Sequence, residues 1–289
     1  MVTEKLLPLA LAFIMFALGL GLTLADFGRV FRQPRAIAIG LVSQMLLLPA
    51  IGWGVCVLFR LPPEMAAGLM LLAACPGGAS AGLITKLAQG ETALSISLTA
   101  ITSVLAVVSV PVIVDFALRH FTGAGIATSL PVLDVVRGVF IITTVPVALG
   151  MLLRHLRPAL VKRVEPMAGR IATGLFVAIV VATFVSQRQS LFDHLAGTGP
   201  AALTLCMLTM AAGFGLGALA RVERRGCIAI AVESGLQNAA LAIFLAVSVL
   251  KLPAMAVPGV IYALLMNVCA IAFIGLMRLK PGKPLPAAQ

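Results

Sequence analysis

The sequence predicts an all-α polytopic membrane protein with nine transmembrane helices, and its composition and its long apolar runs support that fold class. Hydrophobic residues make up 61% of the 289 residues and charged residues only 11%, which excludes a soluble globular domain. The apolar runs exceed the ~20 residues that a helix needs to cross about 30 Å of hydrocarbon. The weak ten-residue alternation of an outer-membrane barrel is absent from the sequence, so the spans are expected to be helices.

The apolar runs predict nine spans. Their expected ranges are 5–25, 36–59, 64–86, 91–118, 131–153, 166–187, 198–220, 226–250 and 253–277. The first run is preceded only by Glu4 and Lys5 as charged residues, and it has no small-residue cleavage site followed by a polar start. It is therefore interpreted as a span and not as a cleaved signal peptide.

Basic residues gather in alternate connections between these spans. That set holds 15 of the 21 Lys and Arg residues, namely Arg29, Arg32, Arg35, Lys86, Arg154, Arg157, Lys162, Arg163, Arg170, Arg221, Arg224, Arg225, Arg278, Lys280 and Lys283. By the positive-inside rule, the N-terminus is expected outside the cell and the C-terminus in the cytoplasm. The membrane would be a cell membrane, such as a bacterial inner membrane. The net charge of +11 is interpreted as this topology signal, and no nucleic-acid partner is expected.

Cysteine and histidine residues indicate neither a cofactor site nor an enzyme. The five cysteines are scattered through apolar segments without Cys-x-x-Cys or Cys/His spacing, which is typical of core packing. The three histidines fall in or near the expected loops, and no Ser/His/Asp set converges on one predicted face. No resident cofactor and no catalytic residues are expected.

An offset of 158 residues predicts that two halves of the chain are related, and the alternative is a coincidence of hydrophobic spacing. This shift places spans one to four on spans six to nine, and it brings Pro76-Gly77-Gly78 close to Gly235. Five helices separate corresponding spans, so the halves would enter the membrane in opposite orientations. Inverted repeats with one broken helix in each half are typical of secondary transporters whose site lies where the broken helices meet.

The two expected breaks carry the unusual polar residues of the chain. Glu233 is the only acidic residue deep within a run that could cross a bilayer, and Ser234, Gly235, Gln237 and Asn238 follow it. A charge at a helix centre costs about 2.5 to 3.5 kcal/mol on insertion scales, so this carboxylate predicts a functional site. Pro76 and its two glycines predict unwound backbone in span three, although a simple kink satisfied by neighbouring helices would also explain them.

These motifs together resemble the bile acid:sodium symporter family. The matching stretches are 13–24, 44–50, Cys75-Pro-Gly-Gly with 90–99, and Glu233-Ser-Gly-Leu-Gln-Asn with Ala256-Val-Pro-Gly. The resemblance implies a panel domain of spans 5–25, 131–153 and 166–187. It also implies a core domain of spans within 36–118 and 198–277, in which spans three and eight cross at their unwound centres.

The resemblance also implies two Na⁺ sites that share Glu233. Sodium site two would comprise Gln44, Glu233, Ser234, Leu236 and Gln237, with Ser234 and Leu236 contributing carbonyl oxygens. Sodium site one would use Ser95, Thr99 and Glu233, together with a Ser-Asn pair that is Ala81-Gly82 in this chain. Two side-chain oxygens are therefore missing from site one, and oxygen-ligated cation sites depend on the number of ligands.

Further polar residues are candidates for substrate binding or for replacing a cation. Substrate-binding candidates are Ala79, Ser80, Ala81, Gly82, Asn238 and Asn267, although Asn267 could instead bond between helices. Lys86 lies one helical turn after Gly82, so its ammonium could replace the missing cation near Glu233. The alternative is an interfacial lysine that reaches the cytoplasmic surface.

The resulting hypothesis is a secondary active transporter that couples Na⁺ symport to an organic anion by alternating access. The anion would be a carboxylate or a bile-acid-like molecule, and the protein would be a monomer or weak dimer in a lipid bilayer. The alternatives are a proton-coupled or sodium-independent carrier, in which Glu233 binds a proton, and a non-cycling anion sensor or channel.

Overall fold

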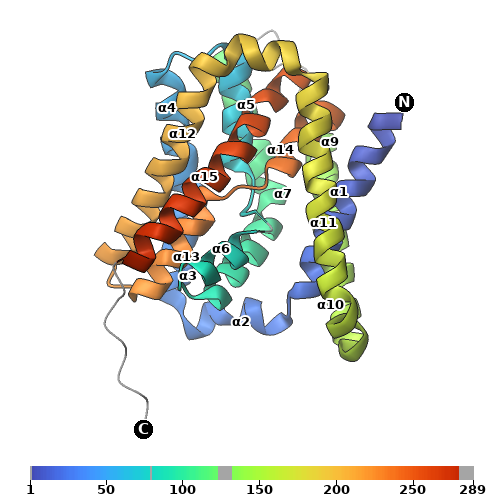
Figure 1. The fold of residues 1–289 in the computed structure, drawn as a ribbon, viewed down its shortest axis with the longest axis vertical. Coiled ribbons are helices and arrows are strands. Elements are labelled where there is room, and N and C mark those ends of the chain that lie inside the picture. Colours follow the sequence, from blue (N-terminus) through green and yellow to red (C-terminus); the bar gives the residue numbers. More distant parts are fainter. Residues whose placement is uncertain (1, 79, 123–131, 280–289) are drawn as a thin grey trace.

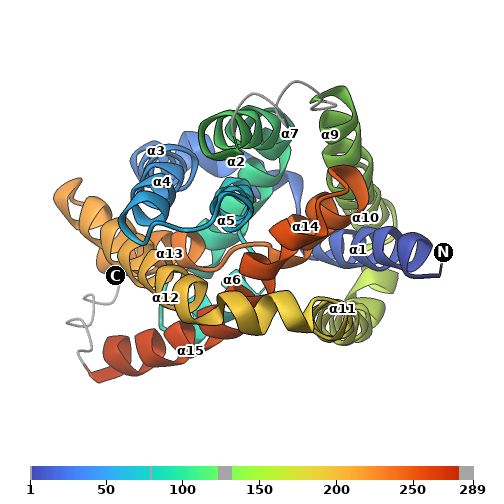
Figure 2. The same ribbon diagram turned by 90° about the horizontal axis from the view of Figure 1, so that it is seen from above.

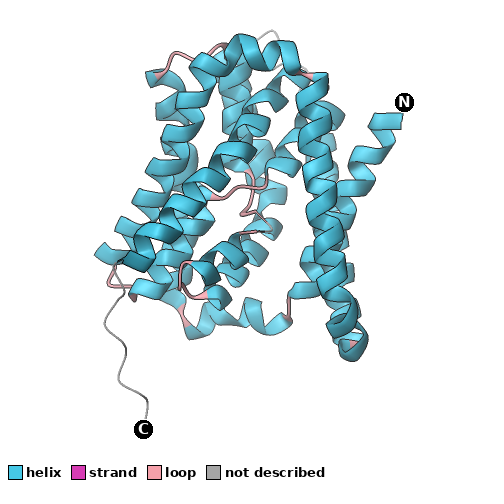
Figure 3. Cartoon of the chain, viewed as in Figure 1, coloured by secondary structure: helices cyan, strands magenta, loops and turns pink. Residues whose placement is uncertain are grey.

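The computed structural model describes residues 2–78, 80–122 and 132–279, and all of the regular elements in these ranges are helices (Figures 1 and 3). Six helical segments are long and apolar enough to cross a membrane. They are Pro34–Leu58, Thr92–Thr122, Leu133–Leu156, Pro158–Ser186, Arg188–Leu219 and Pro253–Leu279. The predicted class, an all-α polytopic membrane protein, is therefore confirmed.

Within each described range, the helices follow one another with short connections. They are α1 (Val2–Gly21), α2 (Leu24–Arg32), α3 (Pro34–Val42), α4 (Leu48–Leu58), α5 (Pro63–Ala74), α6 (Ala81–Leu87), α7 (Thr92–Thr122), α9 (Val132–Val139), α10 (Val145–Leu156), α11 (Pro158–Ser186), α12 (Arg188–Leu219), α13 (Arg224–Gly235), α14 (Ala239–Phe244) and α15 (Val257–Leu279). Three π-helical turns, Ser43–Leu47, Phe140–Thr144 and Leu245–Val249, and a 3₁₀ turn, Pro253–Ala256, join or extend them.

The six long segments correspond to predicted spans two, four, five, six, seven and nine. Two of them start earlier than predicted, because α11 begins at Pro158 and not near 166, and α12 begins at Arg188 and not near 198. The added residues include Lys, Arg, Glu and Gln, which are good helix formers, so the helices continue beyond their apolar runs. The remaining predicted spans correspond to α1 and to two interrupted pairs, α5 with α6 and α13 with α14.

Two of the π-helical turns lie just before a proline. Leu48 N–H bonds the Ser43 carbonyl, five residues back, immediately before Pro49. Since proline has no N–H, a carbonyl one turn earlier loses its partner and the helix can widen there. Ser43 and Gln44 occupy the widened turn, and both side chains are buried. The same arrangement recurs at Phe140–Thr144 before Pro146.

Helices α1, α10 and α11 group together on one side of the molecule (Figure 2). Helices α1 and α10 cross at two glycines without space for side chains. A Cβ atom at Gly19 would overlap the Val147 carbonyl, and one at Gly150 would overlap the Phe16 carbonyl. Small residues at such a crossing let the two backbones approach closely, as is common between membrane helices.

The two interrupted pairs cross in the middle of the fold. Helix α5 ends before the Pro76-Gly77-Gly78 segment, α13 ends at Gly235, and both connections run as extended loops through the centre of Figure 3. Gly77 and Gln237 form an antiparallel β-bridge. Gly78 N–H donates to Leu236 O at 2.7 Å and Asn238 N–H donates to Pro76 O at 3.0 Å. Backbone groups freed by the breaks therefore satisfy one another, as buried amides must.

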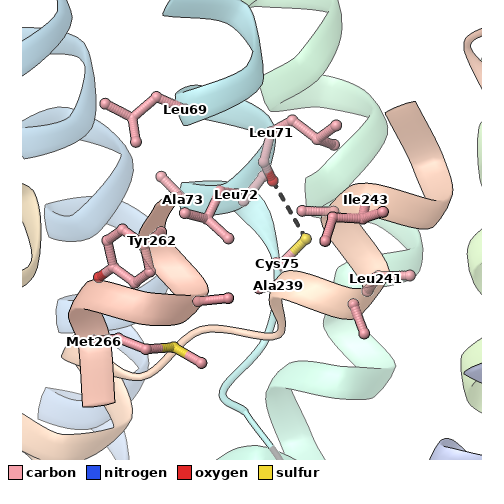
Figure 4. Close-up of a cluster of buried hydrophobic side chains, with 14 of the residues drawn as sticks. Leu69, Leu71, Leu72, Ala73, Cys75, Ala239, Leu241, Ile243, Tyr262 and Met266 are labelled. Atoms are coloured by element: carbon pink, nitrogen blue, oxygen red, sulfur yellow. Dashed lines mark hydrogen bonds between the residues drawn. The ribbon is translucent and has the colours of Figure 1, made fainter. Parts of the chain in front are cut away.

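The largest buried cluster surrounds this crossover. Its side chains come from most of the helices, and Figure 4 shows those of α5, α14 and α15 that lie around Cys75, the residue after α5. The Cys75 thiol donates to the Leu71 carbonyl at 3.3 Å within its own helix. The cluster holds the half-helices in place, so the unwound segments lie in a fixed and apolar frame.

Candidate functional site

Glu233 lies in the last turn of α13, directly before the break, and only 1% of its surface is exposed. The Ser95 hydroxyl donates to Oε1, and the Thr99 hydroxyl lies 2.9 Å from both carboxylate oxygens. Ser95 and Thr99 are four residues apart on α7 and so lie on the same face. These partners are neutral, and no Lys or Arg of the described chain bonds the carboxylate. A buried carboxylate without a basic partner favours a bound cation.

Gly77 lies against this carboxylate. A Cβ atom at position 77 would overlap Glu233 Oε2 and would lie 3.4 Å from the Thr99 hydroxyl. The Pro-Gly-Gly segment that follows α5 therefore crosses Glu233 with no space for a side chain at position 77. The φ angle of Gly77 is not in the left-handed region, so its backbone conformation does not require glycine. The close approach to the carboxylate does.

Two glutamines contribute amide oxygens that have no partner. Gln237 Nε2 donates to the carbonyls of Glu233 and Ser234, at 3.1 and 2.9 Å, and its Oε1 atom is buried without a hydrogen bond. Both polar atoms of Gln44 are buried and unpaired, and the residue is 2% exposed. Leaving a buried polar group unsatisfied costs about 1–3 kcal/mol, so each such group requires an explanation, for example a ligand.

One hydrogen bond ties the Gln44 turn to the crossover. The hydroxyls of Ser43 and Ser234 lie 2.8 Å apart, and the π-helical turn that carries Gln44 contacts α13. The structure therefore brings together the elements that carry all five residues predicted for sodium site two. These oxygens come from a carboxylate, amides and carbonyls, which are the ligands that hard cations prefer.

Only some of the residues predicted for sodium site one supply a side-chain oxygen. Ser95 and Thr99 contact Glu233, whereas Ala81 and Gly82 begin α6 and supply no side-chain oxygen. A Cβ atom at Gly82 would lie 3.5 Å from Ile96, the residue after Ser95. Position 82 therefore faces Ile96 of α7.

A cavity of about 520 Å³ lies beside the crossover, between α1, α11, α14 and α15. The crossover side contributes Gly78, Ser80, Gln237 and Asn238, and Asn267 contributes from α15. The opposite wall comes from α1 and α11 and is mainly apolar, with Phe176 and Val177 among its residues. This volume is within the range of pockets that bind small organic molecules.

The predicted substrate-binding residues differ in their position relative to this cavity. Ser80, Asn238 and Asn267 line it, whereas Ala81 and Gly82 are not among its lining residues. Ala79 lies outside the described residues. Sequence reasoning missed the wall formed by α1 and α11, and Thr173, a hydroxyl within predicted span six, was the available signal.

Asn238 directs an amide donor away from its own helix. Its Oδ1 atom accepts from Leu241 N–H at 3.1 Å and caps α14, which fixes the orientation of the amide. Its Nδ2 atom then donates to the Met15 thioether of α1 at 3.7 Å, and a thioether is a weak acceptor. This donor is therefore available for a stronger acceptor such as a carboxylate. Asn267 instead donates to Ala263 O of its own helix at 2.6 Å.

Lys86 is exposed on α6, and its neighbour Thr85 is the residue buried in the interior. The carboxylate of Glu233 is bonded by Ser95 and Thr99 and not by this lysine. The arrangement favours the interfacial interpretation of Lys86 over replacement of a cation.

Comparison with known proteins adds a family match to this geometry. A sequence model described as the Sodium Bile acid symporter family matches residues 8–194. An uncharacterized sodium-dependent transporter of Bacillus subtilis (strain 168), YocS, is 30% identical over 264 residues, which are 89% of this chain and 78% of the relative. A probable chloroplastic sodium/metabolite cotransporter of Arabidopsis thaliana is 28% identical over 288 residues, covering 98% and 69% of the two chains. The ileal sodium/bile acid cotransporter of Cricetulus griseus is 26% identical over 241 residues, covering 82% and 67%. These relatives are named transporters and not enzymes.

Proposed function

Since the chain belongs to the Sodium Bile acid symporter family, we propose that it is a secondary active transporter that couples Na⁺ to the uptake of an organic anion. The observation that carries this proposal is the buried Glu233 carboxylate at the crossover, whose bonded partners are two neutral hydroxyls. The family membership supports the coupling to sodium, and the buried carboxylate supports the proposal that the ion binds at the crossover.

The Na⁺ ion would bind between Glu233, Gln237 and Gln44, with carbonyls of Ser234 and Leu236 completing its ligands. The support is the set of unpaired amide oxygens on Gln44 and Gln237, which a cation would satisfy. Site one retains Ser95, Thr99 and Glu233, yet Ala81 and Gly82 leave it two oxygens short. One ion per cycle is therefore the stoichiometry that this chain favours.

The substrate would be an organic monoanion with an apolar body, such as a small carboxylate or a bile-acid-like molecule. The cavity is lined mainly by apolar side chains, and its polar residues, Ser80, Thr173, Gln237, Asn238 and Asn267, are all neutral. A dianion would lose its hydration there without a compensating positive charge. The Asn238 Nδ2 donor, now bonded only to the Met15 thioether, would donate to the single carboxylate.

The proposed architecture has nine spans in two inverted repeats of four, with α1, α9–α10 and α11 as the panel and the other helices as the core. The matching positions of the two broken helices support the repeat, and the grouping of α1, α10 and α11 supports the panel (Figure 2). The cavity lies between the two proposed domains, so their relative motion would open it to alternate sides. In Figure 1, α1 begins in the upper half of the view and α15 ends in its lower half, as the proposed odd number of spans predicts.

The orientation and the membrane are inferred from charge. The basic connections would face the cytoplasm of a cell, most simply across a bacterial inner membrane, with the N-terminus outside. An inside-negative potential supplies about 2.3 kcal/mol per net charge per 100 mV. One Na⁺ with a monoanion carries no net charge, so the sodium gradient alone would drive this symport.

Uptake by proteoliposomes tests the proposal. Purified protein would be reconstituted and supplied with radiolabelled cholate or pyruvate under an inward Na⁺ gradient, an inward proton gradient, or neither. The proposal expects saturable accumulation that requires Na⁺ and that is lost in Glu233→Gln. Accumulation driven by protons without Na⁺ would assign Glu233 as a proton carrier, and Na⁺-dependent binding without saturable counterflow would indicate a sensor.

A further inference from the structure

Tyr262 is the only tyrosine of the chain, and it lies fully buried on α15, next to the crossover (Figure 4). Its hydroxyl donates to the carbonyl of Gly235 at 2.8 Å. The Cys206 thiol of α12 donates to the same carbonyl at 3.5 Å. Two donors from different helices therefore converge on the last residue of α13.

Gly235 is also confined sterically on that side. A Cβ atom at position 235 would overlap Met210 Cγ and would lie 2.9 Å from Met210 Sδ. Helix α12 thus approaches the glycine closely, while Tyr262 and Cys206 fix the direction of its carbonyl. The preceding residue of α13 is tied by the Ser43–Ser234 hydroxyl pair. The end of α13 is consequently held at two successive residues.

This carbonyl lies between the two carbonyls assigned above to the Na⁺ ion, those of Ser234 and Leu236. Because each peptide unit is planar, fixing the direction of the Gly235 carbonyl also fixes the plane shared with Leu236 N. The chain leaves the helix at this point, since Leu236 is extended with φ −104° and ψ 101°. The Leu236 carbonyl accepts from Gly78 N–H at 2.7 Å, and the Gly235 carbonyl before it is held by Tyr262 and Cys206.

We propose that Tyr262 is a positioning residue of the cation site, whose hydroxyl holds the Gly235 carbonyl so that the flanking carbonyls of Ser234 and Leu236 face the ion. The inference rests on the proposed function, and it adds to the site a residue that does not itself touch Na⁺. Tyr262 would set the affinity for sodium by preorganising the unwound turn, and Cys206 would assist as a weaker donor.

The test is a sodium titration of the purified full-length chain. The melting temperature would be followed from 0 to 300 mM NaCl at ionic strength kept constant with choline chloride, since stabilisation by a ligand reports its dissociation constant. Tyr262→Phe removes the hydroxyl and keeps the ring. It is expected to raise the apparent Kd for Na⁺ about fivefold, which corresponds to ~1 kcal/mol. Cys206→Ala is expected to raise it about twofold.

Thr143→Val is the matched control, because Thr143 is fully buried and its hydroxyl bonds only its own helix, at Val139 O. This variant should titrate as the wild type does. A merely structural role for Tyr262 predicts a lower melting temperature in choline chloride with an unchanged Kd for Na⁺, and that result overturns the proposal. If Tyr262→Phe does not fold, an unchanged Kd in Cys206→Ala overturns it.

The wild-type titration separates this inference from the function on which it rests. A wild-type protein that Na⁺ does not stabilise contradicts the sodium site itself. A wild-type protein that responds to Na⁺, with the same Kd in Tyr262→Phe, contradicts only the role of the tyrosine. In uptake assays Tyr262→Phe should raise the half-saturating Na⁺ concentration, while the maximal rate of uptake at saturating Na⁺ changes little.

Discussion

Alanine at position 77 would place one methyl group against the proposed sodium ligand. A Cβ atom there would overlap Glu233 Oε2 and would lie 3.2 Å from its Cδ atom. The backbone of Gly77 is not in the left-handed region, so alanine adds no conformational strain there. The effect of Gly77→Ala is therefore confined to the carboxylate, which must rotate away from the hydroxyls of Ser95 and Thr99.

The size of the effect follows from the geometry. Adding a methyl group to a fully packed site costs about 1–3 kcal/mol. If this cost falls on the orientation that binds the ion, the apparent Kd for Na⁺ rises by about 5-fold to 150-fold, at 1.36 kcal/mol per tenfold. Aspartate at 233 is one methylene shorter and would withdraw the carboxylate from the new methyl group. Gly77→Ala combined with Glu233→Asp should therefore bind Na⁺ more tightly than Gly77→Ala alone.

Sodium titration of thermal stability in purified protein would measure these constants. Gly54→Ala is the control, because a Cβ atom at Gly54 meets nothing within 4 Å, and it should leave the Kd for Na⁺ unchanged. An unaltered Kd in Gly77→Ala would refute the idea that Glu233 Oε2 faces the ion across this glycine. A similar loss in Gly54→Ala would show that the assay reports stability and not the site.

Three further substitutions give distinct signatures. Gln44→Leu removes two unpaired buried polar atoms, so it should stabilise the sodium-free protein by about 1–3 kcal/mol and weaken the sodium response, as thermal melts in choline and sodium would show. A destabilised protein with a normal response would contradict that role. Asn238→Leu should raise the KM for the carboxylate at least tenfold in uptake assays and, by removing the cap of α14, destabilise the protein by about 1 kcal/mol. Lys86→Ala should leave the sodium dependence of uptake unchanged, because the side chain is exposed, and a changed dependence would restore the cation-replacement hypothesis.

The sequence predicted the fold class and the broken helices because both follow from local composition. Apolar runs longer than 20 residues require helices in a bilayer, and Pro76 with its glycines and Gly235 mark the interruptions. The starts of α11 and α12 were placed late, since hydropathy detects the apolar part of a helix and not its polar extension. The π-helical turns escaped prediction because they depend on which carbonyls remain unpaired in the folded helix.

The geometry of the candidate site could be predicted in part, for similar reasons. Glu233 and Gln237 were recognisable because polar groups are costly in a membrane span and stand out there. The close approach of Gly77 to the carboxylate depends on tertiary packing, as does the contact between Met15 and Asn238. No sequence pattern predicts either contact. A role for Tyr262 could have been predicted, since a single phenol within an apolar span requires a hydrogen-bond partner.

The central claim is that Glu233 couples sodium to anion transport, and uptake of radiolabelled cholate or pyruvate into proteoliposomes measures it most directly. With a sodium gradient and no proton gradient, the account predicts accumulation above equilibrium for at least one of these monoanions in the wild type, and its loss in Glu233→Gln. Accumulation that proceeds equally in choline, or that persists in Glu233→Gln, would contradict the account.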